Sequence, residues 1–137
     1  MKKIYPVIFT AADSGVLVEV PDLEILTEGK NMPDAFDMAR DAIGLKGISF
    51  LDRNIAIPEP SDLNEIDLEK SVFKEEGEAV VSYVDIDFLE YQRKNDNRSV
   101  RRNVTLPNWL NKEAEAAHLN VSKILQEALM SRLGVSK

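Results

Sequence analysis

The last 40 residues carry the pattern that most constrains the fold. A strand predicted over residues 100–106 is followed by Pro107 and a helix that runs to about His118. Asn120 is expected to take the left-handed conformation after this helix, and Ser122 is expected to cap a second helix that ends at Gly134. A unit of this size cannot bury enough surface alone, and a chain with no cysteine and one histidine lacks disulfides and multi-histidine metal sites. We therefore predict an intertwined homodimer, or a higher even oligomer, in which the lone strand pairs with its copy.

Side-chain alternation gives this strand two faces. Val100, Val104 and Leu106 form the inward face, which also carries Arg102, and the outward face displays arginine, asparagine and threonine. A two-stranded ribbon fits the DNA major groove, where these three residue types match guanine, adenine and the thymine methyl group. Backbone N–H groups at the start of the second helix suit a phosphate. The predicted DNA-binding residues are Arg98, Arg101, Arg102, Asn103, Thr105, Ser122 and Lys123. A helical dimerisation module with an incidentally basic strand is the alternative.

Charge is divided unevenly along the chain. Residues 1–97 hold 10 basic and 21 acidic side chains, a net charge of −11, whereas residues 98–137 hold 7 and 3, a net charge of +4. The 44% hydrophobic and 30% charged composition is that of a globular protein, so both parts are expected to fold. The division indicates two partners of opposite charge, one of them nucleic acid; a solvated surface with uneven charge is the alternative.

The first 90 residues read as a small sheet with a packed helix. Residues 3–9 and 16–20 predict a hairpin, residues 25–29 a third strand, and residues 79–88 a half-buried strand. Asn31 and Asp34 predict a helix start, and Gly44 and Gly47 weaken the far end of that helix. Residues 57–61 form a loop, residues 62–78 give no assignment, and residues 91–99 have no period and indicate a linker. The predicted class is α+β, with domains over 1–90 and 100–137 joined by a linker over 91–99.

The chain start resembles a short signal peptide, but it reads better as the first strand of the hairpin. Pro6 interrupts the apolar run, and Asp13-Ser14-Gly15 is a turn sequence. No apolar run approaches the roughly 20 residues that a bilayer requires. We therefore expect a cytoplasmic protein with no membrane contact.

Two sets of residues carry a family resemblance. Asn103 to Leu110 followed by Asn120 to Leu129 resembles a ribbon-helix-helix repressor domain. The N-terminal half resembles the HicB antitoxins, through Tyr5-Pro-Val-Ile-Phe9, Gly15 to Val20, Pro21-Asp-Leu23, Thr27-Glu-Gly29 and Ala35 to Ala42. The chain departs from the family pattern at Glu24-Ile25-Leu26, where Gly-Cys is frequent, and at Asn120, where glycine is frequent.

The resemblance implies a degraded, partial ribonuclease H-like domain that masks a HicA-type, messenger-RNA-cleaving toxin, and a C-terminal domain that binds operator DNA and represses the operon. The net negative charge of residues 1–97 suits such a toxin, because a protein that binds RNA is expected to be basic. Candidate toxin contacts are the acids near the hairpin and the loop after it: Asp13, Asp22, Glu24 and Glu28. The alternative is a free-standing ribbon-helix-helix repressor whose N-terminal domain senses a small ligand.

An enzymatic role finds little support. A ribonuclease H-type nuclease needs converging carboxylates, one of them on the first strand, and residues 3–9 contain none. Asp85 and Asp87 share a strand face and could hold a divalent ion, although such a pair is more often the solvent side of a strand. We assign His118 to the surface and Trp109 to core or dimer packing. We expect no enzyme, no cofactor, no metal and no catalytic residue.

Overall fold

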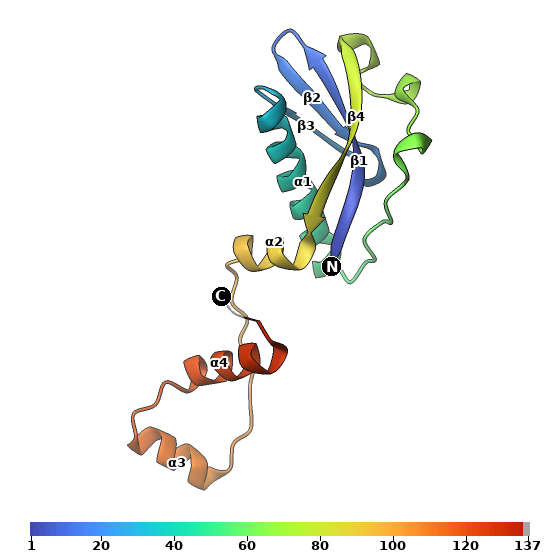
Figure 1. Ribbon diagram of the computed structural model, residues 1–137. Helices are drawn as coiled ribbons and strands as arrows, with labels where there is room; N and C mark the ends of the chain where they lie inside the picture. Colours follow the sequence, from blue (N-terminus) through green and yellow to red (C-terminus); the bar gives the residue numbers. More distant parts are fainter. Residues whose placement is uncertain (136–137) are drawn as a thin grey trace. The chain divides into compact units, whose positions relative to one another are not determined.

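The computed structural model describes residues 1–135, and the chain divides into two compact units, Met1–Asn97 and the part that begins at Arg98. The fold is α+β, with a four-stranded antiparallel sheet and two helices in the first unit and two helices in the second (Figure 1). No helix within residues 1–135 combines the length and the apolar character that crossing a bilayer would need.

The sheet of the first unit has the strand order β3-β2-β1-β4. Its strands are β1 (Lys2–Ala12), β2 (Gly15–Val20), β3 (Ile25–Gly29) and β4 (Glu78–Asp87). The hairpin, the third strand and the half-buried strand expected from the sequence are confirmed. Pro6 is tolerated within β1 because the pairing of β1 with β2 begins only at Ile8, opposite Glu19.

Helix α1 (Met32–Asp52) packs on one face of the sheet. The side chain of Asn31 accepts a hydrogen bond from the backbone N–H of Asp34, as the sequence predicts for this helix start. The carboxylate of Asp34 accepts a hydrogen bond from the backbone N–H of Lys30, the residue before the cap Asn31. The core between helix and sheet contains Tyr5, Val7, Phe9, Val18, Val20, Ala35, Ala39, Ile43, Val84 and Ile86.

The opposite face of the sheet is covered by the chain between α1 and β4, for which the sequence gives no assignment over residues 62–78. Three single-turn 3₁₀ segments occur there: Leu63–Glu65, Leu68–Lys70 and Lys74–Glu76. The carboxylate of Glu19 on β2 accepts hydrogen bonds from the Ser71 hydroxyl and the Val72 N–H. The Tyr83 hydroxyl accepts another from the backbone of Leu63 at 3.0 Å. Ile8 and Thr10 of β1 are thereby buried on this face as well.

The linker expected over 91–99 is wrong in its first half, because helix α2 (Phe88–Asn95) continues directly from β4. Gly44 and Gly47 explain why α2 packs on α1. A Cβ at Gly47 would lie 2.2 Å from the ring of Phe88, and one at Gly44 would lie 2.6 Å from the ring of Tyr91. The two glycines thus do not end α1, which runs to Asp52. They form a notch for two aromatic rings.

The second unit contains α3 (Asn108–Ala116) and α4 (Val121–Leu133). The expected strand over 100–106 is absent from the described single chain, because a lone strand has no partner for its backbone groups. His118, rather than Asn120, takes the left-handed conformation after α3, with a φ of 56°. The N–H groups of His118 and Leu119 donate to the carbonyls of Glu115 and Ala114, which is a Schellman ending.

Candidate functional site

The second unit encloses a groove instead of a core. Segment 98–106 and α4 line a space of about 830 Å³, with Val100, Val104, Leu125 and Leu129 as its apolar walls. Among residues 98–135 no side chain is buried, and Val100 is 90% exposed. Folded units of soluble proteins bury their large apolar side chains, so the described chain leaves this unit incomplete by itself.

The DNA-binding candidates lie around this groove. Arg101, Arg102 and Asn103 line it together with Val100 and Val104, so the two alternating faces expected from the sequence are not separated in the single chain. Thr105 is exposed. Trp109 is 63% exposed, so it is not a core residue of the single chain.

The start of α4 differs from the expected phosphate site. Asn120, not Ser122, caps the helix, and its side-chain oxygen accepts the backbone N–H of Lys123 at 3.1 Å. That N–H therefore already has a partner. Ser122 lines the groove instead of capping the helix. Gly134 ends α4 in a left-handed conformation, as the sequence predicts.

The four acidic candidates of the first unit do not form one surface. Asp13 lies in the β1–β2 turn, whereas Asp22 and Glu24 lie beyond the other end of β2. Glu28 is opposite Leu17, near the start of β2. Asp22 is moreover engaged within the fold, because its carboxylate accepts hydrogen bonds from the Ser61 N–H at 2.8 Å and the Ser61 hydroxyl at 2.7 Å. The other three side chains are exposed.

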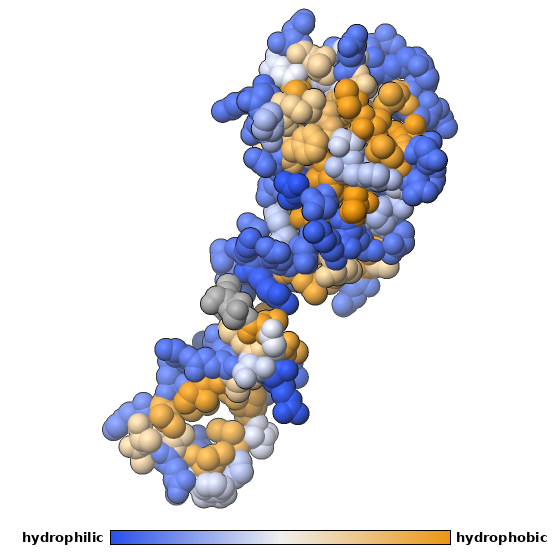
Figure 2. All heavy atoms as spheres, viewed as in Figure 1, coloured by the Kyte–Doolittle hydropathy of each residue, from blue (hydrophilic) through white to orange (hydrophobic). Residues whose placement is uncertain are grey.

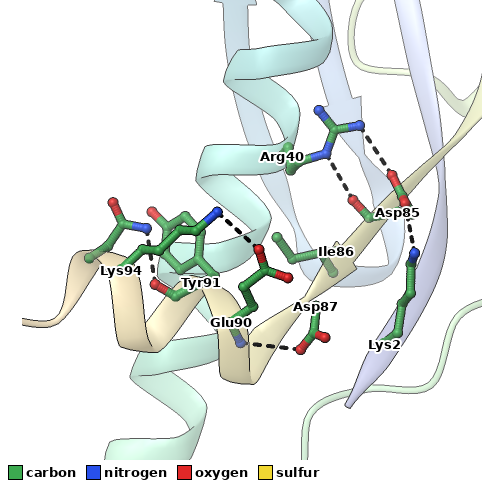
Figure 3. Close-up of a pocket in the computed structure, with 9 residues that line it drawn as sticks. Lys2, Arg40, Asp85, Ile86, Asp87, Glu90, Tyr91 and Lys94 are labelled. Carbon is green, nitrogen blue, oxygen red and sulfur yellow. Dashed lines mark hydrogen bonds and ion pairs between the residues drawn. The ribbon is translucent and has the colours of Figure 1, made fainter. Parts of the chain in front are cut away.

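A pocket of about 230 Å³ lies where the end of β4 meets α1 and α2 (Figure 3). Arg40 of α1 donates from Nε to the carbonyl oxygen of Asp85 and from Nη2 to its carboxylate, both at 3.1 Å. The Nζ of Lys2 lies 3.4 Å from the other carboxylate oxygen. The hydrogen bond from Arg40, followed by that from Lys2, holds the pKa of Asp85 below its usual value.

Asp87 has a different role. Its carboxylate accepts the backbone N–H groups of Leu89 and Glu90 at 3.1 and 3.2 Å and so caps α2. The hydrogen bond from Glu90 contributes most to lowering the pKa of Asp87. The carboxylates of Asp85 and Asp87 are therefore engaged by protein cations and backbone donors. Within residues 1–135 no three acids or histidines gather as a metal ion would require.

Sequence reasoning missed Arg40 and Tyr91. The Tyr91 hydroxyl donates to Asp41 at 2.7 Å, which ties α2 to α1, and its pKa is raised by burial and by this carboxylate. Tyr5, buried in the core, donates to the carbonyl of Pro58 at 2.6 Å, and burial raises its pKa to about 12. These pairs are 45 to 53 residues apart in the chain. No local pattern in the sequence signals such contacts.

Comparison with known proteins gives consistent results. Residues 5–129 match the family model described as HicB_like antitoxin of bacterial toxin-antitoxin system. A chain of a toxin–antitoxin complex from Streptococcus pneumoniae is 24% identical, with a TM-score of 0.61, and the match covers 96% of this chain and 99% of that one. The antitoxin HicB of Burkholderia pseudomallei is 22% identical, with a TM-score of 0.52 over 98% and 99% of the two chains.

A chain of a HicA3 and HicB3 toxin-antitoxin complex is 23% identical, with a TM-score of 0.50 over 61% of this chain and 98% of that chain. No curated protein matches the sequence significantly. At these identities the solved structures establish a shared fold.

Proposed function

Because the chain belongs to the HicB-like antitoxin family of bacterial toxin–antitoxin systems, we propose that its first unit binds and neutralises a HicA-type, RNA-cleaving toxin and that its second unit binds DNA as a dimer. One observation supports assigning toxin binding to the first unit and DNA binding to the second. The acidic first unit has its own buried core, whereas the basic second unit buries no side chain among residues 98–135. The first unit is thus built to fold alone and the second to associate.

The charge of the first unit supports a basic partner. Its net charge is −11, and a protein that binds RNA presents a basic surface. Charge complementarity speeds association and disfavours acidic competitors. The solved complexes from Streptococcus pneumoniae and of HicA3 with HicB3 show that proteins of this fold occur in toxin–antitoxin complexes. Of the four acids that the sequence offers as toxin contacts, Asp13, Glu24 and Glu28 are exposed but lie apart, and Asp22 holds Ser61.

The experiment that tests toxin binding is co-expression with the HicA-type toxin from the same organism. We expect the two proteins to copurify and the toxic effect of that protein to disappear. Residues 1–97 should suffice for both, because the core, α1 and α2 all lie within them. Failure of the full chain to bind that protein would overturn the proposal.

The groove of the second unit supports dimerisation. Its walls include Val100, Val104, Leu125 and Leu129, and a second copy of the chain supplies the same apolar residues in return. Antiparallel pairing of the two 100–106 segments would also satisfy backbone groups that have no strand partner in one chain. Such a ribbon-helix-helix dimer would present Arg101, Asn103 and Thr105 on one surface.

DNA binding is tested with variants of the two kinds of candidate. Arg101→Ala or Asn103→Ala should lower the ratio of operator to scrambled-duplex affinity by roughly tenfold per half-site, because a base contact is worth about 1–3 kcal/mol. Lys123→Ala should weaken binding to both duplexes equally and reduce its salt dependence, because a side-chain phosphate contact releases counterions without reading a base. The measurement is a titration of each folded variant at two salt concentrations. An unchanged ratio for both ribbon variants would contradict base readout by this face.

A further inference from the structure

Strand β4 forms one edge of the sheet, and its backbone groups alternate between β1 and open space. The N–H of Phe88 donates to the carbonyl of Met1 at 3.1 Å, and β4 continues this register to Glu78 opposite Ala11. In an antiparallel pair, hydrogen-bonded and non-hydrogen-bonded positions alternate. The even-numbered residues of β4 therefore bond to β1, and the odd-numbered residues direct their N–H and C=O groups away from the sheet.

One end of this edge is closed by the protein itself. Arg40 covers the outward carbonyl of Asp85 (Figure 3), and Asp87 is the cap of α2. The Ser82 hydroxyl lies 3.3 Å from the carbonyl oxygen of Tyr83. Among the described residues only β1 pairs with β4. The open stretch therefore consists of the N–H groups of Ala79, Val81 and Tyr83 and the carbonyls of Ala79 and Val81.

The side chains along this stretch do not protect it. Residues 79–83 read Ala-Val-Val-Ser-Tyr, without a charge or a proline. Val80 is 57% exposed on the face that carries α1, and Tyr83 is 44% exposed on the other face. Figure 2 shows hydrophobic residues gathered on the viewed side of this unit, where Figure 1 draws β4. Exposed strand edges are normally blocked by charge, proline or short length, so an apolar open edge indicates a binding surface.

The charge beside this edge selects the partner. Residues 62–78 carry seven acidic and two basic side chains, and this segment runs alongside β4, since Leu63 bonds the Tyr83 hydroxyl and Gly77 leads into the strand. Pairing of β4 with the β4 of a second copy would bring two such acidic segments together. A partner strand that carries basic side chains would lie beside side chains of opposite charge, which a second copy of β4 would not.

We propose that the toxin adds a strand to the sheet beside Ala79–Tyr83, with its basic side chains against the acidic segment 62–78. This inference rests on the proposed toxin binding and assigns a place to it. Main-chain hydrogen bonds to β4 would provide affinity, and Val80, Tyr83 and the acidic segment would select the sequence of the incoming strand.

The sharpest test is a proline in the open edge of the full-length chain. Val81→Pro removes an N–H that points away from β1, so the sheet keeps its internal bonds, whereas the incoming strand loses a donor and meets the proline ring. We expect affinity for the HicA-type toxin from the same organism to fall roughly tenfold or more. Val81→Thr keeps the N–H and nearly the same shape, and should bind within about twofold of wild type. Equal affinity for the two variants would overturn the proposal.

A charge comparison tests the surface without altering the strand backbone. Glu76→Lys with Glu78→Lys reverses two exposed acids beside β4, and Glu24→Lys with Glu28→Lys makes the same change around β3, at the opposite edge. The first pair should weaken toxin binding several-fold more than the second. Equal losses would mean that charge acts only at long range, and a greater loss for the second pair would place the contact at β3. Either result overturns the proposal.

Amide hydrogen exchange gives a readout that needs no variant. On adding the toxin, the N–H groups of Ala79, Val81 and Tyr83 should become protected while those of β3 stay unchanged. Complex formation without this protection overturns the edge assignment and leaves the antitoxin function standing. Protection of these amides in the toxin-free protein, together with a dimer of residues 1–97 in sedimentation, would identify a second copy as the occupant. Absence of any complex overturns both proposals.

Discussion

At the scale of single residues, packing reverses what helix propensity alone would predict at Gly47. Alanine is favoured over glycine by about 1 kcal/mol inside a helix, but here the added Cβ would lie 2.2 Å from the buried ring of Phe88. We expect Gly47→Ala to lower the free energy of unfolding by roughly 1–3 kcal/mol, as overpacked sites do. Gly44→Ala meets the ring of the less buried Tyr91 and should cost less. Urea denaturation measures both, and a Gly47→Ala variant more stable than wild type would contradict this packing.

The pairing of Asp85 with Arg40 predicts a pH dependence. A carboxyl whose pKa is lower in the folded than in the unfolded chain stabilises the fold above its unfolded pKa, and this contribution is lost as pH falls through the folded pKa. The pKa of Asp85 lies below its usual value of 3.8. The difference in free energy of unfolding between wild type and Asp85→Asn should therefore be largest at pH 7 and shrink below about pH 4. Urea titrations at pH 7 and pH 2.5 measure it, with the exposed turn variant Asp13→Asn as control. A difference that stays constant with pH would contradict the ion pair.

At the scale of elements, α2 belongs to the first unit and not to a linker. A fragment ending at residue 90 cuts this helix and removes Tyr91, which fills the notch at Gly44 and donates to Asp41. Residues 1–97 should unfold cooperatively, and residues 1–90 should melt several degrees lower, since about 1 kcal/mol shifts the Tm of such a domain by about 4–8 °C. Thermal melts followed by circular dichroism give the comparison. Equal melting temperatures would show that α2 adds nothing to the first unit.

At the scale of the whole molecule, we expect the stability of the second unit to depend on association. Leu125 lines the apolar groove of a unit that buries no side chain among residues 98–135. Leu125→Asp would place an unpaired charge in the expected dimer core. Sedimentation should show a dimer or higher even oligomer for wild type and a monomer for this variant. The variant should also lose DNA binding and retain toxin binding. Ser131→Asp, outside the groove, is the control, and a monomeric wild type at micromolar concentration would contradict the prediction.

The sequence by itself determined the local elements of this protein. The hairpin, β3, the start of α1 at Asn31 and the end of α4 at Gly134 follow from turn residues, alternation and caps, all of which act over a few neighbouring residues. The small size of the C-terminal unit, 40 residues, likewise predicted that it cannot bury enough surface alone.

Only the tertiary structure decided what depends on residues far apart in the chain. Gly44 and Gly47 form a notch for α2, and Arg40 pairs with Asp85. Residues 62–78 cover the second face of the sheet. The tertiary structure also left β4 as an open edge, which depends on strand order and has no local signature. The predicted strand over 100–106 is missing for the related reason that no described segment of the single chain pairs with it. Local patterns specify elements, but packing and strand pairing depend on segments that are far apart in the chain.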